Sequence, residues 1–325
     1  MEKLSSEGNI RRIDIRRDLP AIATLIETAF ADQMDDEGRD YLRHIRQIAR
    51  SVGAFILDGN TPESSQLPFH GYLWEEDGSI IGNLTLIPVR KKDRYTYFIA
   101  NVAVAPEQRG RGIARQLTER AIAHVQEHGG KHIYLQVRAD NPPAIHIYQQ
   151  TGFEEIIRRT SWIFPKNFTR RPQSIQGVTL GRRKREDWSQ QKDWLQEVYP
   201  KEIAWNLPYN LGRLRPDFWI WLDNLVNALV CRHWSAHEQG HLIGTASYES
   251  GFSGSDYVWL ATSPVWENQA IQALLPYVHA RVRRPQRIVV NYPAGRGENG
   301  FTACGMQELH TLIWMKKEIP AKTET

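Results

Sequence analysis

A run of seven residues, QRGRGIA, places two arginines and two glycines between an apolar stretch and an amphipathic one. The stretch before it, FIANVAVAPE, is typical of a buried strand, and the residues after it repeat apolar side chains at helical spacing. A helix start carries unpaired N–H groups and a partial positive charge, and glycines let an anion come close. Arginines add attraction for phosphate oxygens. The run therefore fits a pyrophosphate cradle, and it also fits a tight turn whose arginines face solvent.

The elements around this run follow from the apolar patterns on both sides of it. Asp18 and Pro20 are typical of a helix start, and Asp77-Gly78 is a strong hairpin signal. We expect strands at 13–15, 95–105, 132–137 and 153–164, a hairpin at 71–90, and helices at 19–30, 38–52, 112–128 and 144–150. This order predicts a mixed α/β layer.

Composition narrows the class of protein. The chain has 325 residues with 41% hydrophobic and 24% charged residues, which indicates a folded, soluble protein, and its length favours two domains. Its net charge of +4 is too diffuse to predict a nucleic-acid partner. Only two cysteines occur, and we find neither an apolar signal core nor a membrane span. We therefore expect a cytoplasmic protein with no metal site and no membrane partner, as a monomer or homodimer.

The second half repeats the layout of the first only weakly. Strands are expected at 241–250, 256–264 and 286–293, a helix at 268–282, and a closing strand at 311–319. Nine of the 11 tryptophans lie in this half, so it is no plain copy. The pattern predicts a duplicated fold, with domains at 1–166 and 177–325 and a linker at 167–176.

Two motifs, in order, carry a family resemblance. Arg109, Gly112 and Ala114 match the motif Arg/Gln-x-x-Gly-x-Gly/Ala, and LQVRADNPPAIHIYQQTGF follows at the proper distance. The second motif supplies Asn141, Ala144, Tyr148, Gly152 and Phe153. Over roughly 10–164 the chain resembles the GNAT acetyltransferase superfamily, and within it the ribosomal-protein alanine N-acetyltransferases.

The resemblance implies a fold and a cofactor. The fold would be two GNAT-like domains in tandem, each with a mixed central sheet whose fourth and fifth strands splay apart. Acetyl-CoA would lie in that gap. The resemblance assigns its binding to Val102, Ala103, Val104, Arg109, Gly110, Arg111, Gly112, Ile113, Ala114, Arg115, Asn141 and Ala144. Val102 to Val104 also fit plain sheet core, and Asn141 before two prolines also fits a helix cap.

Tyr148 is the candidate catalytic residue that the resemblance implies. A phenol within hydrogen-bond range can protonate a leaving thiolate, although the same tyrosine also fits simple packing. The alanine acetyltransferases carry a glutamate where this chain has Gln136, and a neutral amide cannot act as the base. Three routes for loss of the amine proton stay open: a relay through water, another carboxylate as the base, or a substrate amine that arrives already neutral. The acidic loop with Asp32, Asp35, Asp36 and Glu37 is either an attractor for a cationic amine or a solvated turn.

The second half lacks the features that would make it a second active copy. It has no Arg-x-x-Gly-x-Gly/Ala motif, and Phe301 falls where Tyr148 stands in the first half. The leading hypothesis is therefore one acetyl-CoA-dependent N-acetyltransferase domain, in which a primary amine of a small molecule or protein attacks directly in a ternary complex. A non-catalytic acyl-CoA-binding module and transfer of a longer acyl chain are the alternatives.

Overall fold

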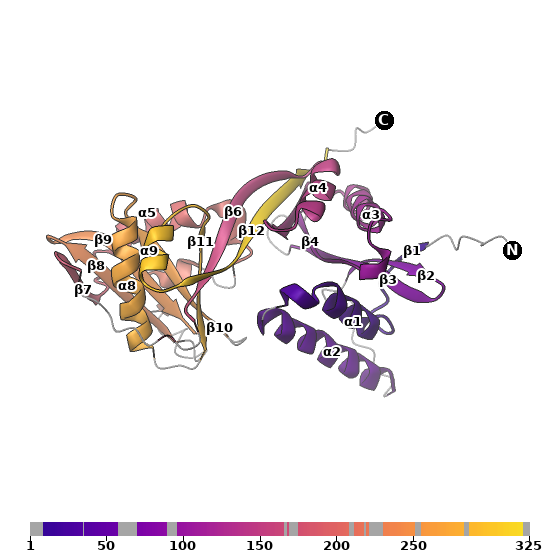
Figure 1. Cartoon of the computed structure of the whole chain (residues 1–325), viewed down its shortest axis with the longest axis horizontal. Coiled ribbons are helices and arrows are strands. Elements are labelled where there is room, and N and C mark those ends of the chain that lie inside the picture. The colour runs from indigo at the N-terminus through magenta and orange to yellow at the C-terminus, as the bar shows by residue number, and fades with distance from the viewer. Residues whose placement is uncertain are drawn as a thin grey trace. The chain divides into compact units, whose positions relative to one another are not determined.

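The computed structural model describes residues 9–34, 36–57, 70–89, 96–165, 168, 175–207, 211–217, 219–220, 230–250, 255–282 and 286–320. The chain divides into two compact units, and each is described by itself. Unit 1 consists of Met1–Ile157 and Leu312–Thr325, and unit 2 of Arg158–Thr311. Helices are interspersed with strands along the chain, as in the predicted mixed α/β layer (Figure 1).

Unit 1 contains a mixed sheet with helices on both faces. Its strands follow the order β1-β2-β3-β4-β5-β12, with β4 and β5 parallel and the other pairs antiparallel. The elements are β1 (Asn9–Arg12), α1 (Leu19–Ala29), η1 (Ala31–Gln33), α2 (Asp36–Leu57), β2 (His70–Glu76), β3 (Ser79–Pro88), β4 (Thr96–Val104), η3 (Pro106–Gln108), α3 (Ile113–Glu127), β5 (His132–Arg138), α4 (Pro142–Gln150) and the end of β12 (Gln307–Glu318).

Unit 2 repeats this plan. Its strand order is β6-β11-β10-β9-β8-β7, and β10 and β11 form its parallel pair. The elements are β6 (Glu154–Ile163), β7 (Val178–Arg182), α5 (Trp188–Val198), α6 (Lys201–Ala204), η4 (Leu211–Leu214), β8 (Cys231–Glu238), β9 (His241–Glu249), β10 (Ser255–Thr262), α8 (Glu267–Arg281), β11 (Arg287–Pro293) and α9 (Glu298–Ala303).

Two strands pass from one unit to the other. From Arg159 on, β6 pairs with β11 of unit 2, and from Leu312 on, β12 pairs with β5 of unit 1. The compact units therefore differ from the predicted domains 1–166 and 177–325, because the strand expected to close the second domain completes the first unit instead. The predicted linker 167–176 lies largely outside the described residues.

Two apolar layers fix the helices of unit 1 on its sheet. One joins α3 and α4 to the sheet, with Leu117, Leu135 and Ile313 among its residues, and the other joins α1 and α2 to the opposite face, with Ile22 and Ala103 among its residues (Figure 1). Gly82 sets the approach of α3. A Cβ there would lie 2.8 Å from Ile113 Cγ2 and 3.1 Å from Leu117 Cδ1, so only glycine lets α3 come this close to β3.

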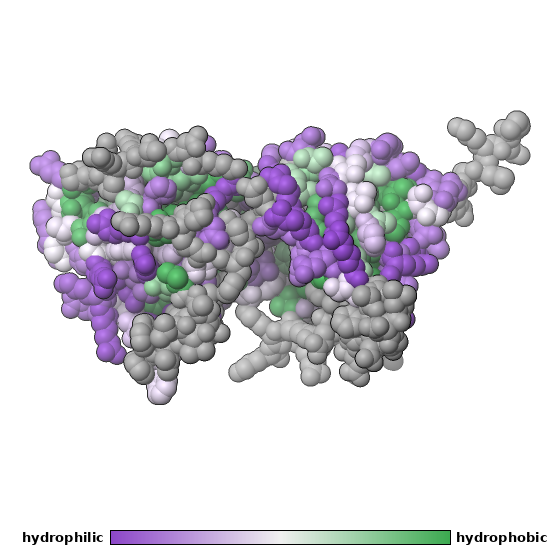
Figure 2. Space-filling model, turned by 90° about the horizontal axis from the view of Figure 1, so that it is seen from below, coloured by the Kyte–Doolittle hydropathy of each residue, from purple (hydrophilic) through white to green (hydrophobic). Residues whose placement is uncertain are grey.

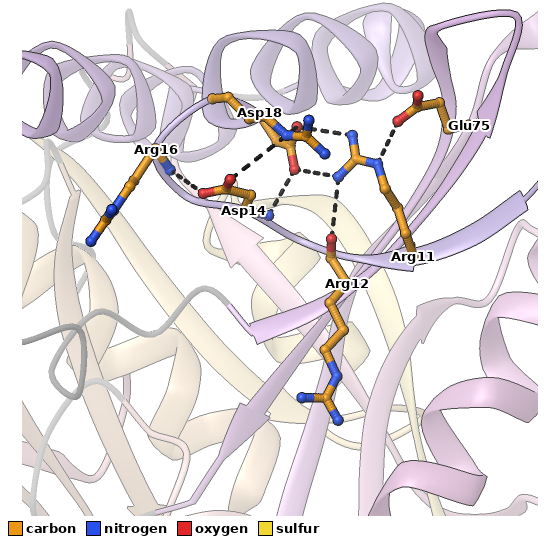
Figure 3. Close-up of polar contacts among 7 residues, drawn as sticks. Arg11, Arg12, Asp14, Arg16, Asp18 and Glu75 are labelled. Atoms are coloured by element: carbon orange, nitrogen blue, oxygen red, sulfur yellow. Dashed lines mark hydrogen bonds and ion pairs between the residues drawn. The ribbon is translucent and has the colours of Figure 1, made fainter.

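The start of α1 is held by an ion-pair cluster (Figure 3). Arg11 donates to both carboxylate oxygens of Asp18, at 2.6 and 2.9 Å, and also binds Glu75. Asp18 is the residue before α1, as predicted, but its side chain accepts from the Asp14 N–H at 2.7 Å and makes no cap bond. This turn ends the extended chain at Arg12, so the predicted strand at 13–15 is wrong.

The surface of unit 1 and unit 2 carries both hydrophilic and hydrophobic side chains (Figure 2). On the face shown in Figure 2, hydrophilic residues cover much of the described surface and hydrophobic residues are visible between them. Among the described helices, none is both long and apolar enough to cross a membrane.

Candidate functional site

The two parallel strands of unit 1 separate part of the way along. β4 and β5 pair over four residues, from Thr96 opposite His132 to Ile99 opposite Leu135. Beyond Ile99, the strand continues to Val104, and among the described strands it pairs there only with β3. Because the amides on the β5 side of this segment have no strand partner, they can bond an extended ligand that carries amides.

A β-bulge interrupts β4 at the point where the strands separate. Asn101 and Val102 together lie opposite Leu84, and Asn101 has φ +52°. The extra residue reverses which face each side chain occupies. Ile99 packs in the layer under α3, and after the bulge Val102 packs against that layer while Ala103 joins the layer under α1 and α2. The bulge thus turns the backbone of 101–104 relative to a regular strand.

A network of polar side chains holds this bulge. The Asn83 side-chain amide, which is 0% exposed, donates to the Asn101 carbonyl at 2.7 Å. The Asn101 side-chain amide donates to the Tyr41 hydroxyl of α2 at 2.6 Å and lies 3.4 Å from Thr85 Oγ1. Burial raises the pKa of Tyr41, so its hydroxyl stays protonated at neutral pH. Sequence reasoning missed all of these residues, and the only signal was polar asparagines within apolar strand patterns.

The start of α3 is open to a ligand. Gly110 and Gly112 have φ values of +80° and +78°, and a Cβ at Gly110 would meet nothing within 4 Å. In this described part of the chain, the first backbone bond of the helix runs from the Gln116 N–H to the Gly112 carbonyl, and the six amides of 110–115 have no acceptor. Unpaired amides at a helix start, together with the helix dipole, favour an anion.

The three arginines near this helix start are held by protein groups. Arg109 donates to the Ala29 carbonyl at the end of α1 at 2.8 Å, and Arg111 pairs with Glu76 at 2.9 Å. Arg115 pairs with Glu119 one helical turn later, at 2.8 Å. The backbone amides are therefore open donors at this position, and each guanidinium keeps further N–H groups beyond those in these bonds.

Two more predicted residues lie on α4. Asn141 is the N-cap residue of α4, and its Oδ1 accepts from the Ala144 N–H at 3.2 Å, so the capping interpretation is confirmed. Tyr148 is buried at 7% exposure, with its ring edge-on to Phe153. Burial raises the pKa of Tyr148 above its usual value. The phenol therefore keeps a proton that it can donate.

Gln136 lies on the other side of the sheet from α3 and α4. Its neighbours Leu135 and Val137 pack under these helices, and because side chains alternate along a strand, Gln136 points to the opposite face. It is the first residue after the last β4–β5 pair, directly opposite Trp314 of β12. Asp35 of the acidic loop lies outside the described residues, and the side chains of Asp36 and Glu37 do as well.

In unit 2 the counterpart of the α3 start has an acidic residue in its first turn. Glu267 stands in the first turn of α8 and accepts from Arg296 Nη2 at 2.7 Å and from the Tyr292 hydroxyl at 2.8 Å. Phe301 occupies the place of Tyr148. The Phe153 N–H donates to the Tyr148 carbonyl at 2.9 Å, as the Met306 N–H donates to the Phe301 carbonyl at 3.0 Å.

The residues that the structure describes include no group of three or more His, Cys, Asp or Glu side chains placed to hold a metal ion.

Comparisons with known proteins agree with this geometry. Residues 33–153 match the acetyltransferase (GNAT) family. The chain is 26% identical over 161 residues to the uncharacterized N-acetyltransferase YjgM of Escherichia coli, which covers 48% of this chain and 88% of that protein. It is 36% identical over 70 residues to the [ribosomal protein bS18]-alanine N-acetyltransferase of Escherichia coli, which covers 22% of this chain and 46% of that protein.

The fold of the whole chain also has a solved counterpart. A tandem GNAT protein from the clavulanic acid biosynthesis pathway aligns with a TM-score of 0.53 at 15% identity, over 97% of this chain and 100% of that one. Apart from YjgM, the chain spans less than half the length of the curated relatives it matches. Residues 33–153 of this chain thus match the GNAT acetyltransferase family, and the chain as a whole shares the fold of a tandem GNAT protein.

Proposed function

We propose that unit 1 is an acetyl-CoA-dependent N-acetyltransferase that acts on a primary amine. The observation that carries this proposal is the combination of an open β4 edge beyond Ile99 and unpaired amides at 110–115. The two features lie on one continuous stretch of chain, so a single extended ligand with amides and a diphosphate can use both. Acetyl-CoA supplies an activated acyl group when bound.

The chain's own residues support binding in three ways. The amides of Gly110 to Arg115 donate to no backbone acceptor, so they are available to bind an anion. The edge at Val102, Ala103 and Val104 offers donors and acceptors to an amide chain. Asn141 fixes the start of α4, and Ala144 packs beside Tyr148 in the same apolar layer. These residues fit the ligand that the family uses.

The roles in transfer follow from protonation and position. Tyr148 stays protonated at neutral pH because burial raises its pKa, and its hydroxyl is the group proposed to donate its proton to the departing thiolate. Gln136 cannot take the proton of an ammonium group, so the amine loses that proton to water or to a group outside this pair of residues. Most of the rate then comes from positioning and from backbone N–H groups that polarise a carbonyl at the β4 edge.

Unit 2 is proposed as a supporting domain without a cofactor site, because the first turn of α8 carries the acidic Glu267 and Phe301 has no hydroxyl. The alanine N-acetyltransferase relative is named for a protein amino group, and YjgM is named only by its reaction class. The acceptor proposed here is accordingly a small-molecule amine or a protein amino group. A cytoplasmic location and a monomeric or homodimeric state remain predictions.

An assay with the full chain tests this function. Acetyl-CoA is incubated with a panel of primary amines, including α-amino peptides, lysine peptides and polyamines, and thiol release is followed. We expect amine-dependent thiol release with at least one acceptor, faster with acetyl-CoA than with longer acyl thioesters. Binding of acetyl-CoA with no turnover on any amine would favour a non-catalytic binding module instead.

A further inference from the structure

The bulge in β4 is secured from two sides by a chain of hydrogen bonds. On one side the buried Asn83 amide holds the Asn101 carbonyl at 2.7 Å, and on the other the Asn101 amide reaches the Tyr41 hydroxyl at 2.6 Å. Asn101 needs this support because φ +52° is unfavourable for most residues other than glycine. Asparagine tolerates this conformation better than most, at a cost of order 1 kcal/mol.

The bulge decides where the following amides point. Without the extra residue, the alternation set by Ile99 would place Ala103 under α3, whereas Ala103 packs with α1 and α2. The amides of 102–104 are therefore turned relative to a regular strand at the position where β4 has left β5. Small changes in the direction of these N–H groups weaken their effect, because a donor stabilises developing charge only at short range and with good alignment.

The network also ties the bulge to α2. Tyr41 comes from α2 and packs against the apolar layer under α1 and α2, and it is 60 residues from Asn101 in sequence. Within the described residues, Asn83 Oδ1 is buried without a partner. An unpaired buried oxygen costs stability. The Asn83 carboxamide therefore does not adopt its orientation in order to pair all of its own polar atoms. The bond to the Asn101 carbonyl is the contact that the orientation secures.

We propose that Asn83, Asn101 and Tyr41 are positioning residues for acetyl transfer: they lock the β4 bulge and so aim the amides of Val102 to Val104 at the thioester carbonyl. This proposal rests on the proposed function of unit 1. It assigns the three side chains no contact with acetyl-CoA or the amine. Their effect passes through the backbone of β4.

The test measures carbonyl polarisation directly and needs no acceptor. Acetyl-CoA labelled with ¹³C at the acetyl carbonyl is bound to the full chain, and the C=O stretch is read by isotope-edited infrared spectroscopy. We expect a shift to lower frequency on wild-type protein. Tyr41→Phe removes one acceptor from the network and Asn83→Asp replaces the donor facing the Asn101 carbonyl by an oxygen. Both should move the stretch back toward its value in water.

Binding and turnover complete the test. We expect the dissociation constant for acetyl-CoA to change less than about twofold in both variants, while kcat falls roughly 10-fold. Asn101→Gly, which permits positive φ, should lie closer to wild type than Asn101→Ala, which does not. Tyr72→Phe is the matched control, because it removes another half-buried tyrosine bond of unit 1, to His124 at 2.8 Å, and should leave the stretch and kcat unchanged.

The outcomes separate the two proposals. If acetyl-CoA does not bind, the proposed function of unit 1 fails. If it binds and the stretch in Tyr41→Phe and Asn83→Asp equals that of wild type, the function stands and the positioning role is refuted. A loss of thermal stability with an unchanged stretch has the same meaning, since it shows a purely structural network.

Discussion

Unit 1 and unit 2 place a helix at the same point of the same kind of sheet, yet the two helix starts are completed differently. Gly82 pairs with Val104 under α3, and Gly244 pairs with Thr262 under α8, where a Cβ would meet Ala270 Cβ at 2.8 Å. The start of α3 leaves its amides open, whereas the start of α8 carries a carboxylate of its own. Equal backbone plans therefore do not give equal sites.

The strands that lead to these helices differ as well. β10 pairs with β9 from Tyr257 to Thr262 without a shift, while β4 carries the extra residue at Asn101 and Val102. Tyr148 in unit 1 is matched by Phe301 in unit 2. Unit 1 thus has a helix start without an acidic side chain, a bulge and a phenol at these positions, and unit 2 has none of the three. This coincidence is what a duplicated fold with a single retained site would show.

Ala114→Glu tests the difference between the two helix starts with the largest expected effect, because it gives α3 an acidic first turn like that of α8. The new carboxylate repels a diphosphate and competes for the open amides, so we expect acetyl-CoA affinity to fall by about 100-fold or more. Calorimetry measures it. Ala114→Gln, of equal size but neutral, should lose much less. Equal losses in both variants would show that space, and not charge, decides binding.

Tyr148→Phe makes the site of unit 1 resemble that of unit 2 at the phenol. We expect kcat to fall roughly 10- to 100-fold with little change in acetyl-CoA affinity, since only acid assistance is lost. Because burial raises the pKa of Tyr148, the phenol stays protonated below its ordinary pKa of about 10, so the pH profile below that value should keep its shape. A lost basic limb at neutral pH would assign Tyr148 a different role.

Glu267→Gln tests the comparison from the side of unit 2. The Arg296 guanidinium and the Tyr292 hydroxyl lose a charged acceptor, so we expect unfolding to become easier by about 1–3 kcal/mol. Denaturant unfolding measures this change. The stoichiometry of acetyl-CoA should stay at one per chain. Appearance of a second binding site would mean that Glu267 alone had closed unit 2.

Asp18→Asn extends the comparison to a third helix start, that of α1, where Arg11 pairs with the acidic side chain of Asp18. Burial opposes the charge on Asp18, but bonds from Arg11 and the Asp14 N–H hold its pKa below the usual value. A depressed pKa stabilises the fold above the unfolded value of about 4, and this contribution is lost as pH falls through the folded value. We expect a loss of about 1–2 kcal/mol at pH 7 that shrinks below about pH 4. A loss independent of pH would contradict the ionised pair.

Much of unit 1 could be predicted from local sequence. The helix at 112–128, the strand at 132–137 and the glycines of QRGRGIA each carry short-range signals, and the structure has α3, β5 and positive φ values there. The exchange of β6 and β12 could not be predicted, because an apolar strand does not reveal which neighbour it pairs with. Phe301 was correctly predicted as the counterpart of Tyr148, because both positions were counted back from the glycine that follows each helix.

The candidate site was predicted in part. The backbone cradle and Tyr148 followed from motifs, but the pairing of the arginines with Ala29, Glu76 and Glu119 depends on distant or exposed groups. The contacts of Asn101 join positions 18 and 60 residues apart, which no local pattern specifies. A single asparagine inside an apolar strand has several physical explanations, and only the register with β3 identifies a bulge.

The location of bound acetyl-CoA in a crystal structure of the full chain tests the central claim most directly. We predict one molecule per chain, with its diphosphate at the amides of 110–115 and its thioester between the bulged strand and Tyr148. A molecule seated at the start of α8, or density absent from the α3 start at saturating ligand, would contradict the account.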